Sequence, residues 1–220
     1  MSDPRPVGDI QPGGRPLVWS VVVAAGSGSR FGGAKQYESL GGRRVLDWSV
    51  AAARAATDGV VLVVHPSQIG RTEASADACV VGGTTRSASV RAGLLVVPIE
   101  VDVIVVHDAA RPIASAELFA AVIAAVAGGA DAAVPGVPVV DTLRWRTGRT
   151  VDRDRLVAVQ TPQAFRAAAL RMAHDHGAEA SDDATLVEGT GGRVVVVEGE
   201  PRNRKITDQA DLALVESLLR

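Results

Sequence analysis

Short, continuous runs of apolar residues alternate with alanine-rich, helix-like segments along most of this 220-residue chain. Runs without a polar alternation are typical of parallel strands that helices cover on both faces. We predict strands over Leu17–Val23, Val60–Val64, Ala78–Val81, Val103–Val106, Ala132–Val134 and Val194–Val197, and helices over Val45–Ala56, Arg86–Val96 and Ala116–Ala127. The alternation predicts an α/β fold: a Rossmann-like, doubly wound and mostly parallel sheet.

Residues 136–160 interrupt this rhythm. A loosely alternating run over Val137–Trp145 is followed by a turn at Thr147-Gly148-Arg149 and by a second run over Val151–Val159. Two such runs around a turn predict a β-hairpin. A lone two-stranded hairpin is only marginally stable in water, so we expect this projecting arm, at about residues 137–159, to embrace a second copy of the chain rather than decorate the surface.

The two ends of the chain have different characters. Residues 1–16 are rich in proline, glycine and aspartate without an apolar core, so we expect a disordered tail that is neither a signal peptide nor an anchor. Residues 17–220 are expected to form a single domain. Its last element should be a helix over Asp208–Leu219, capped by Thr207.

Composition excludes several classes of protein. The formal net charge is −2, and no Lys/Arg run with interleaved aromatic residues occurs, so we expect no nucleic-acid partner. No apolar run reaches the roughly 18 residues that cross a bilayer, so we expect no membrane partner. The chain's one cysteine, Cys79, cannot form an internal disulfide, which favours a reducing, cytoplasmic location.

A glycine-rich loop, Ala24-Ala25-Gly26-Ser27-Gly28-Ser29-Arg30, follows the first predicted strand, and Lys35 lies close behind. Glycines let backbone N–H groups converge on an anion, and two cations beside them suit a nucleoside triphosphate. The loop is not a Walker motif, because Lys35 lacks the preceding glycine and the following Ser/Thr. It is not a dinucleotide fingerprint either, because Phe31 takes the place of the third glycine. We therefore predict a phosphate site of another kind.

Three further polar clusters follow predicted strands, where ligands of parallel sheets bind. Residues 82–89 begin with paired glycines and offer hydroxyls, which suits a nucleotide base or ribose, or simply a turn before a helix. Asp108 and Arg111, in His107–Pro112, could bind a metal or sugar hydroxyl, or could pair with each other. Lys205 lies after the predicted strand Val194–Val197, and its side chain is either held at the site or solvated.

In order along the chain, these motifs resemble one family. They are the glycine loop, Ala34-Lys35-Gln36-Tyr37, His107–Pro112, Asp141-Thr142, Gln160-Thr161-Pro162-Gln163 and Asn203-Arg204-Lys205-Ile206-Thr207. The chain is similar to the 2-C-methyl-D-erythritol 4-phosphate cytidylyltransferases of non-mevalonate isoprenoid biosynthesis, which have the fold of nucleotide-diphospho-sugar transferases. The resemblance implies transfer of CMP from CTP to methylerythritol phosphate, with Mg²⁺ or another divalent cation, in a homodimer formed through the β-arm.

The resemblance also implies roles for individual residues. The catalytic residues would be Arg30 and Lys35, which face the triphosphate, and Lys205, which lies near the phosphate of the alcohol. The CTP site would be lined by Ala24, Ala25, Gly26, Gly28, Gly82, Ser89 and Ala109. The phosphate of the alcohol would lie near Asp108, Arg111, Thr142, Arg153 and Thr161, with Asp108 also the metal ligand and Arg153 supplied by the neighbouring subunit.

Two alternatives remain. A cytidylyltransferase acting on another polyol phosphate, such as ribitol 5-phosphate, would share the fold and the CTP site. Its usual hexapeptide has valine where this chain has Ala110, which favours methylerythritol phosphate. A non-catalytic nucleotide-binding homologue would be expected to lack Lys35 or Lys205, and both are present.

Overall fold

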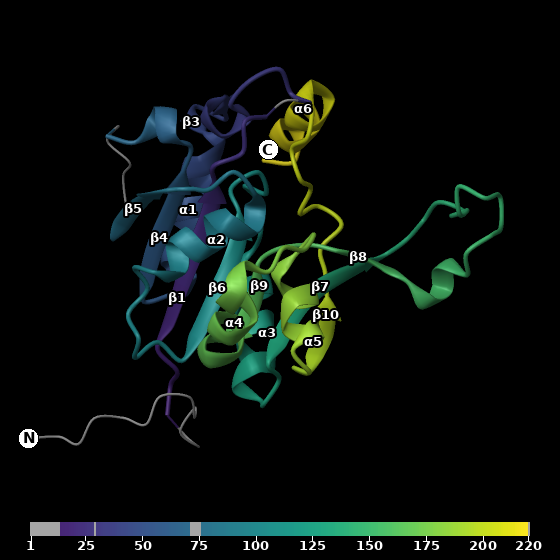
Figure 1. Ribbon diagram of the computed structural model, residues 1–220. Helices are drawn as coiled ribbons and strands as arrows, with labels where there is room; N and C mark the ends of the chain where they lie inside the picture. The colour runs from purple at the N-terminus through teal and green to yellow at the C-terminus, as the bar shows by residue number, and fades with distance from the viewer. Residues whose placement is uncertain (1–13, 29, 71–75, 220) are drawn as a thin grey trace, which may run out of the picture.

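A computed structural model describes residues 14–28, 30–70 and 76–219, and in this part of the chain an eight-stranded sheet forms the centre of the molecule (Figure 1). The strand order is β10-β7-β9-β6-β1-β4-β5, and β8 pairs with β7 beyond this path. The strands are β1 (Val18–Ala24), β4 (Gly59–Val64), β5 (Ala78–Val81), β6 (Val103–Asp108), β7 (Ala132–Pro138), β8 (Val157–Val159), β9 (Gln163–Arg166) and β10 (Val194–Glu198). The predicted α/β class with a mostly parallel sheet is confirmed.

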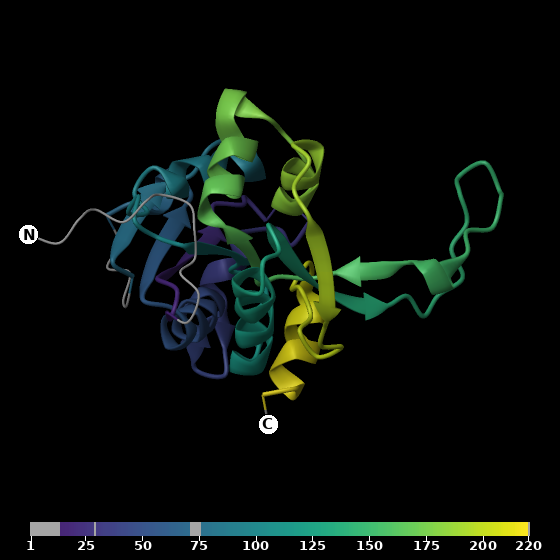
Figure 2. The same ribbon diagram turned by 90° about the horizontal axis from the view of Figure 1, so that it is seen from below.

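Helices cover both faces of the sheet, as the continuous apolar strands require. Figures 1 and 2 show α2 (Arg86–Leu94), α4 (Ala167–His174) and α5 (Asp183–Gly189) on one face, and α1 (Val45–Ala56) and α3 (Ala116–Ala127) on the other. Each face has its own apolar core, one including Val21, Ile104 and Phe165, the other Val22, Val105 and Phe119. All six of these side chains are fully buried.

A smaller third core lies beneath the last helix, α6 (Gln209–Ser217). Phe31, Leu40, Val45, Ile206 and Val215 form it. Two-residue strands β2 (Ser39–Leu40) and β3 (Arg43–Arg44) pair there, and four 3-10 turns complete the described elements: Lys35–Tyr37, Pro66–Gln68, Arg153–Arg155 and Asp175–Gly177. This core ties the chain's C-terminal segment to the glycine-rich loop.

Strand β9 is the main element that the sequence analysis did not predict. It is antiparallel to both of its neighbours, β6 and β7, and so separates the parallel strands. Helices α4 and α5 were also not predicted. The cap of the last helix was wrong: Asp208, not Thr207, caps α6 by accepting from the backbone N–H of Asp211, and the helix ends at Ser217. Helix α2 ends at Leu94 rather than Val96.

The predicted arm leaves the sheet where β7 and β8 pair in antiparallel register, from Gly136↔Val159 to Pro138↔Val157. Beyond these pairs it continues as a long projection with one isolated bridge, Arg144↔Thr150 (Figures 1 and 2). The predicted tail, residues 1–16, lies outside the described residues except for its last three.

Candidate active site

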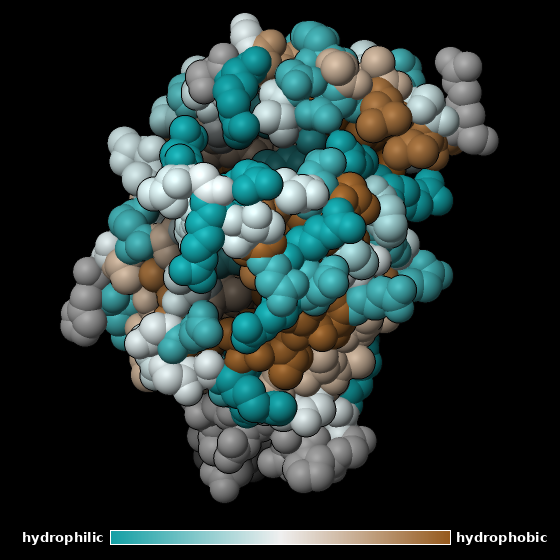
Figure 3. All heavy atoms as spheres, turned by 90° about the vertical axis from the view of Figure 1, so that its right-hand side faces the viewer, coloured by the Kyte–Doolittle hydropathy of each residue, from teal (hydrophilic) through white to brown (hydrophobic). Residues whose placement is uncertain are grey.

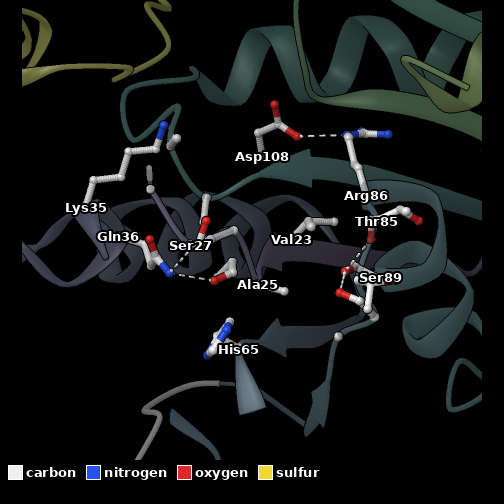
Figure 4. Close-up of a pocket in the computed structure, with 18 of the residues that line it drawn as sticks. Val23, Ala25, Ser27, Lys35, Gln36, His65, Thr85, Arg86, Ser89 and Asp108 are labelled. Atoms are coloured by element: carbon white, nitrogen blue, oxygen red, sulfur yellow. Dashed lines mark hydrogen bonds and ion pairs between the residues drawn. The ribbon is translucent and has the colours of Figure 1, made fainter. Parts of the chain in front are cut away.

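A cavity of about 580 Å³ opens at the carboxyl ends of β1, β4, β5 and β6 (Figure 4). Its volume falls in the range of small-molecule sites, and its position is the one expected for ligands of parallel sheets. The lining includes all three predicted catalytic residues and all seven predicted nucleotide-binding residues. Among the residues assigned to the alcohol's phosphate, Asp108 and Lys205 line this cavity, and Arg111, Thr142, Arg153 and Thr161 do not.

The glycine-rich loop is folded around Gly28, whose carbonyl accepts from the N–H groups of Phe31 at 2.9 Å and Gly32 at 3.0 Å. Gly28 has φ +68°, and a Cβ there would lie 1.7 Å from the carbonyl oxygen of Gly33, so only glycine fits. Buried Gln36 fastens the start of the loop, since its amide donates to the carbonyls of Ala24 at 2.8 Å and Gly26 at 3.1 Å. The loop is thus held in shape by its own sequence.

Positive charge gathers at one end of the cavity. Burial lowers the pKa of Lys35 below the ordinary value for lysine, and the nearby charges of Lys205 and Arg30 lower it further. Repulsion among cations exceeds the attraction of Asp108 and Asp211 there, which means that the positive charge is incompletely neutralised in the free protein. Such a cluster is suited to receiving a polyanion.

Asp108 ends β6 and is the carboxylate at the centre of the cavity, with a side chain only 11% exposed. Its Oδ2 accepts from Lys205 Nζ at 2.6 Å, and its Oδ1 lies 3.4 Å from Arg86 Nε. Burial alone would raise the pKa of Asp108, but the charges of Lys205 and Arg86 outweigh it and hold this pKa well below the usual range. Asp108 is therefore ionised at neutral pH.

The C-terminal segment places Lys205 at the site, although its side chain is still 40% exposed. Its neighbour Ile206 is fully buried and donates its N–H to the carbonyl of Ala110 at 2.8 Å. Asn203, also fully buried, donates to the carbonyl of Thr161 at 2.9 Å. Both anchors restrict where Lys205 can reach, so its contact with Asp108 follows from the fold.

At the opposite wall of the cavity, the loops after β1 and β5 lie so close together that a side chain at Gly82 would clash. A Cβ on Gly82 would lie 2.4 Å from the Cβ of Ala25 and 2.8 Å from the hydroxyl of Ser89. Ser89 in turn donates to the carbonyl of Thr85, the N-cap of α2, at 2.9 Å. The glycine is required for packing between the β1 and β5 loops, and the narrow wall can select a small, flat group.

Thr161 and Arg111 lie behind the cavity rather than in its lining. The buried hydroxyl of Thr161 accepts from the N–H of Asp108 at 3.0 Å and contacts Nδ1 of His107 at 3.1 Å. His107 is a packed histidine: burial lowers its pKa to about 4, and its Nε2 donates to the Arg111 carbonyl. Arg111 donates to the carbonyl of Asn203 at 2.7 Å, and its Nε is buried with no hydrogen-bond partner among the described residues.

Thr142 and Arg153 lie in the arm, outside the lining of this cavity. Both are exposed, and Arg153 donates to the carbonyl of Val140 within the arm. The structure of one chain therefore does not bring these two residues to the cavity. Their predicted roles depend on a second chain.

Gln36, His65 and Arg86 are among the lining residues to which the sequence alone assigned no role. His65 directly follows β4, and its place at a strand's carboxyl end was a usable signal. Gln36 lies within the motif Ala34-Lys35-Gln36-Tyr37, but nothing in the sequence indicated its role. Arg86 acts through partners distant in sequence, which no local pattern reveals.

The chain was compared with known proteins. The sequence profile of the IspD family, described as 2-C-methyl-D-erythritol 4-phosphate cytidylyltransferase, matches residues 18–220. A protein of that name from Thermus thermophilus is 43% identical over 91% of this chain and 96% of its own length. The "Bifunctional enzyme IspD/IspF" of Dinoroseobacter shibae is 42% identical over 93% of this chain but only 54% of its own length. The chain thus spans about half the length of several curated relatives that it matches.

Solved structures show the same likeness. The crystal structure of the cytidylyltransferase from Thermus thermophilus superimposes with a TM-score of 0.78 and 41% identity, covering 90% of this chain and 97% of that one. The bifunctional IspDF of Campylobacter jejuni gives a TM-score of 0.80 at 27% identity, covering 89% of this chain and 53% of that one.

Proposed function

The chain belongs to the 2-C-methyl-D-erythritol 4-phosphate cytidylyltransferase (IspD) family, and on this premise we propose that it transfers CMP from CTP to 2-C-methyl-D-erythritol 4-phosphate. The products are 4-diphosphocytidyl-2-C-methyl-D-erythritol and pyrophosphate. One observation carries the proposal beyond family membership: the glycine loop and a cluster of cations line the same cavity, where burial and then repulsion by Lys205 and Arg30 lower the pKa of Lys35. A triphosphate would relieve that repulsion.

The proposed reaction is an in-line displacement at the α-phosphorus of CTP. A phosphate oxygen of methylerythritol phosphate forms the new P–O bond while the bond to the β-phosphate's bridging oxygen breaks, and pyrophosphate leaves with the electron pair. A phosphate nucleophile needs no general base. The protein's contribution is to position both substrates and to stabilise the charge that develops on the α-phosphate and the leaving group.

Lys35, Arg30 and Lys205 are proposed to supply this stabilisation. Lys35 and Lys205 come from opposite ends of the chain, and both line the cavity, which supports this role. Lys205 contacts Asp108 in the free protein, so the proposed reaction requires it to exchange part of this contact for a phosphate oxygen.

Asp108 is the proposed ligand of Mg²⁺ or another divalent cation. The described residues contain no group of three or more His, Cys, Asp or Glu that could hold a metal. Magnesium is commonly bound by one or two carboxylates together with substrate phosphates, so a single ionised Asp108 beside a triphosphate fits. The cation would neutralise phosphate charge.

The alcohol's phosphate is proposed to bind near Arg111, Thr161 and the arm residues Thr142 and Arg153 of a second subunit. Arg111 supports this placement, because its buried Nε has no partner among the described residues and burial lowers its pKa. Thr161 is proposed to act by holding the backbone of Asp108 rather than through a free hydroxyl.

A homodimer is proposed, formed through the arm. Figure 3 views the side from which the arm projects, where apolar and polar side chains mingle on the surface. Large apolar side chains exposed on the arm and at its base include Val140, at 80% exposed, and Trp145, at 59%, with Leu156, Val157, Val159 and Val196. Burial against a second copy would remove this apolar surface from water.

A cytoplasmic location is also proposed, and the single cysteine supports it. Separately, no helix within residues 14–28, 30–70 and 76–219 has the length and apolar character needed to cross a membrane.

Nucleotide selectivity tests the proposed function. Because the wall formed by Gly82, Ala25 and Ser89 is tight, it should accept a pyrimidine and reject a purine. We expect pyrophosphate release with CTP, in the presence of methylerythritol phosphate, to exceed that with ATP or GTP by at least about 10²-fold in kcat/KM, since misfit and unpaired polar groups combine. Pyrophosphate is measured with a coupled colour assay. Comparable rates with GTP would assign the chain to a different nucleotidyltransferase activity.

A further inference from the structure

A line of alternating charges runs from the cavity into the layer of helices. Lys205 Nζ lies 2.6 Å from Asp108 Oδ2, and Arg86 Nε lies 3.4 Å from Asp108 Oδ1. The same guanidinium then donates from NH1 to Asp183 Oδ2 at 2.6 Å. Asp183, at the start of α5, completes the line by accepting from His174 Nε2 of α4 at 2.9 Å. Figure 4 shows Arg86 directed at Asp108.

Asp183 does not line the cavity, yet its side chain is completely buried. A buried carboxylate is costly unless charged and hydrogen-bonding partners compensate it. Arg86 supplies the opposite charge and His174 supplies a second donor. Nδ1 of His174 is buried without a hydrogen-bond partner among the described residues, so the contact of Nε2 with Asp183 is the ring's hydrogen bond there. The pair Asp183–His174 is therefore a fixed anchor.

Arg86 is shared between two carboxylates, one on each side. It donates to Asp183 through NH1 and to Asp108 through Nε, two nitrogens of one rigid, planar group. Fixing NH1 against Asp183 also fixes where Nε points. If Asp183 lost its charge, Arg86 would be free to turn both nitrogens toward Asp108 and compete with Lys205 for that carboxylate.

We propose that Asp183, supported by His174, is a positioning residue of the nucleotide site, which orients Asp108 and Lys205 through Arg86. It touches no substrate. Its effect is to divide the charge of Arg86 between two carboxylates, so that Arg86 does not displace Lys205 from Asp108 before a phosphate oxygen takes over part of that contact. This inference rests on the proposed function, because its measurable consequence is the rate of CMP transfer.

The test is Asp183→Asn, which keeps the shape of the side chain and removes its charge. We expect kcat per folded site to fall at least tenfold, while KM for CTP changes less than threefold, because the groups that bind the triphosphate remain. Folded sites are counted by calorimetric titration with CTP. Asp182→Asn is the matched control: it removes the same charge one residue earlier, at the N-cap of α5, where asparagine also caps well. Its kcat should stay within twofold of the parent's.

A second variant separates positioning from stability. Arg86→Lys keeps the charge, but one ammonium cannot reproduce the two-sided bridge. In that background Asp183→Asn should cost less than twofold in kcat, because the link that it acts through is already broken. The proposal would be overturned if kcat in the double variant fell by the product of the two single-variant factors. It would also be overturned by a normal kcat in Asp183→Asn.

If Asp183→Asn proves too unstable to assay, the proposal is judged on Arg86→Lys and on Val187→Ala, which removes fully buried methyl groups from the same helix. We expect a tenfold loss of kcat in Arg86→Lys and an unchanged kcat per folded site in Val187→Ala. A normal kcat in the first, or an equal loss in both, would overturn it. Absence of CMP transfer by the parent protein would instead overturn the proposed function.

Discussion

Lys35→Ala is expected to lower turnover by about 10²–10³-fold, or roughly 3–4 kcal/mol of transition-state stabilisation, while CTP binds with much less change in affinity. The lysine lies at the glycine loop, where burial and then the charges of Lys205 and Arg30 lower its pKa. We assign it to charge that grows as pyrophosphate leaves, so its loss affects the transition state more than the bound substrate. Steady-state pyrophosphate release and calorimetric CTP binding measure the two effects separately.

The same variant should not lose stability. Because the folded state lowers the pKa of Lys35, it binds this proton more weakly than the unfolded chain does. This penalty on folding is fully present at a pH below the folded pKa of Lys35, where the lysine is protonated in both states, and it disappears as the pH rises past the unfolded pKa. Lys35→Ala should therefore unfold at the same temperature or higher. Near-normal turnover at saturating substrates would show that Lys35 has no catalytic role.

Mixing two impaired variants is expected to restore activity if arms are exchanged between subunits. Arg153→Ala removes the residue that the arm is proposed to deliver, and Lys35→Ala removes one from the recipient's own site. In a mixed dimer one site receives both defects and the other neither, so about half of the hybrid's sites should regain full activity. At equal mixing, random exchange makes about half of the dimers hybrids, and activity should reach about a quarter of the parent's.

Subunit exchange is verified with differently tagged chains, and each variant alone serves as its own baseline. The exposed apolar side chains of the arm, among them Val140 and Trp145, are the structural reason to expect exchange into a stable pair. No recovery after verified exchange, or a monomer in light scattering, would rule out the shared site.

Much of the fold could be predicted because its strands are continuous apolar runs. Val60–Val64 and Val103–Val106 are fully buried on both faces of the sheet. Such short apolar runs, rich in β-branched residues, favour a strand over a helix. Strand β9 escaped prediction for the opposite reason: Gln163 and Arg166 flank only two apolar residues. Its position is set by the pairing with β6 and β7, which is a tertiary effect that local sequence does not encode.

The site residues likewise fall into those that local sequence indicated and those that only the fold brings together. Arg30, Lys35 and the glycine loop are close in sequence, so their spacing alone indicated a phosphate site. Contacts between residues far apart in the sequence could not be predicted from local patterns. Lys205 donates to Asp108, and Arg86 donates to Asp183, each across 97 positions. The family resemblance had already placed Lys205 and Asp108 at one site, whereas only the structure revealed the pair of Arg86 and Asp183.

The reaction product identifies which alcohol phosphate this chain uses. The purified chain is incubated with CTP, Mg²⁺ and either methylerythritol phosphate or ribitol 5-phosphate, and the products are followed by ³¹P nuclear magnetic resonance and mass spectrometry. We predict the CDP-alcohol of methylerythritol, formed in equal amount with pyrophosphate, and a much slower reaction with ribitol phosphate. Preferential formation of CDP-ribitol, or CTP that stays intact with both alcohols, would contradict this account.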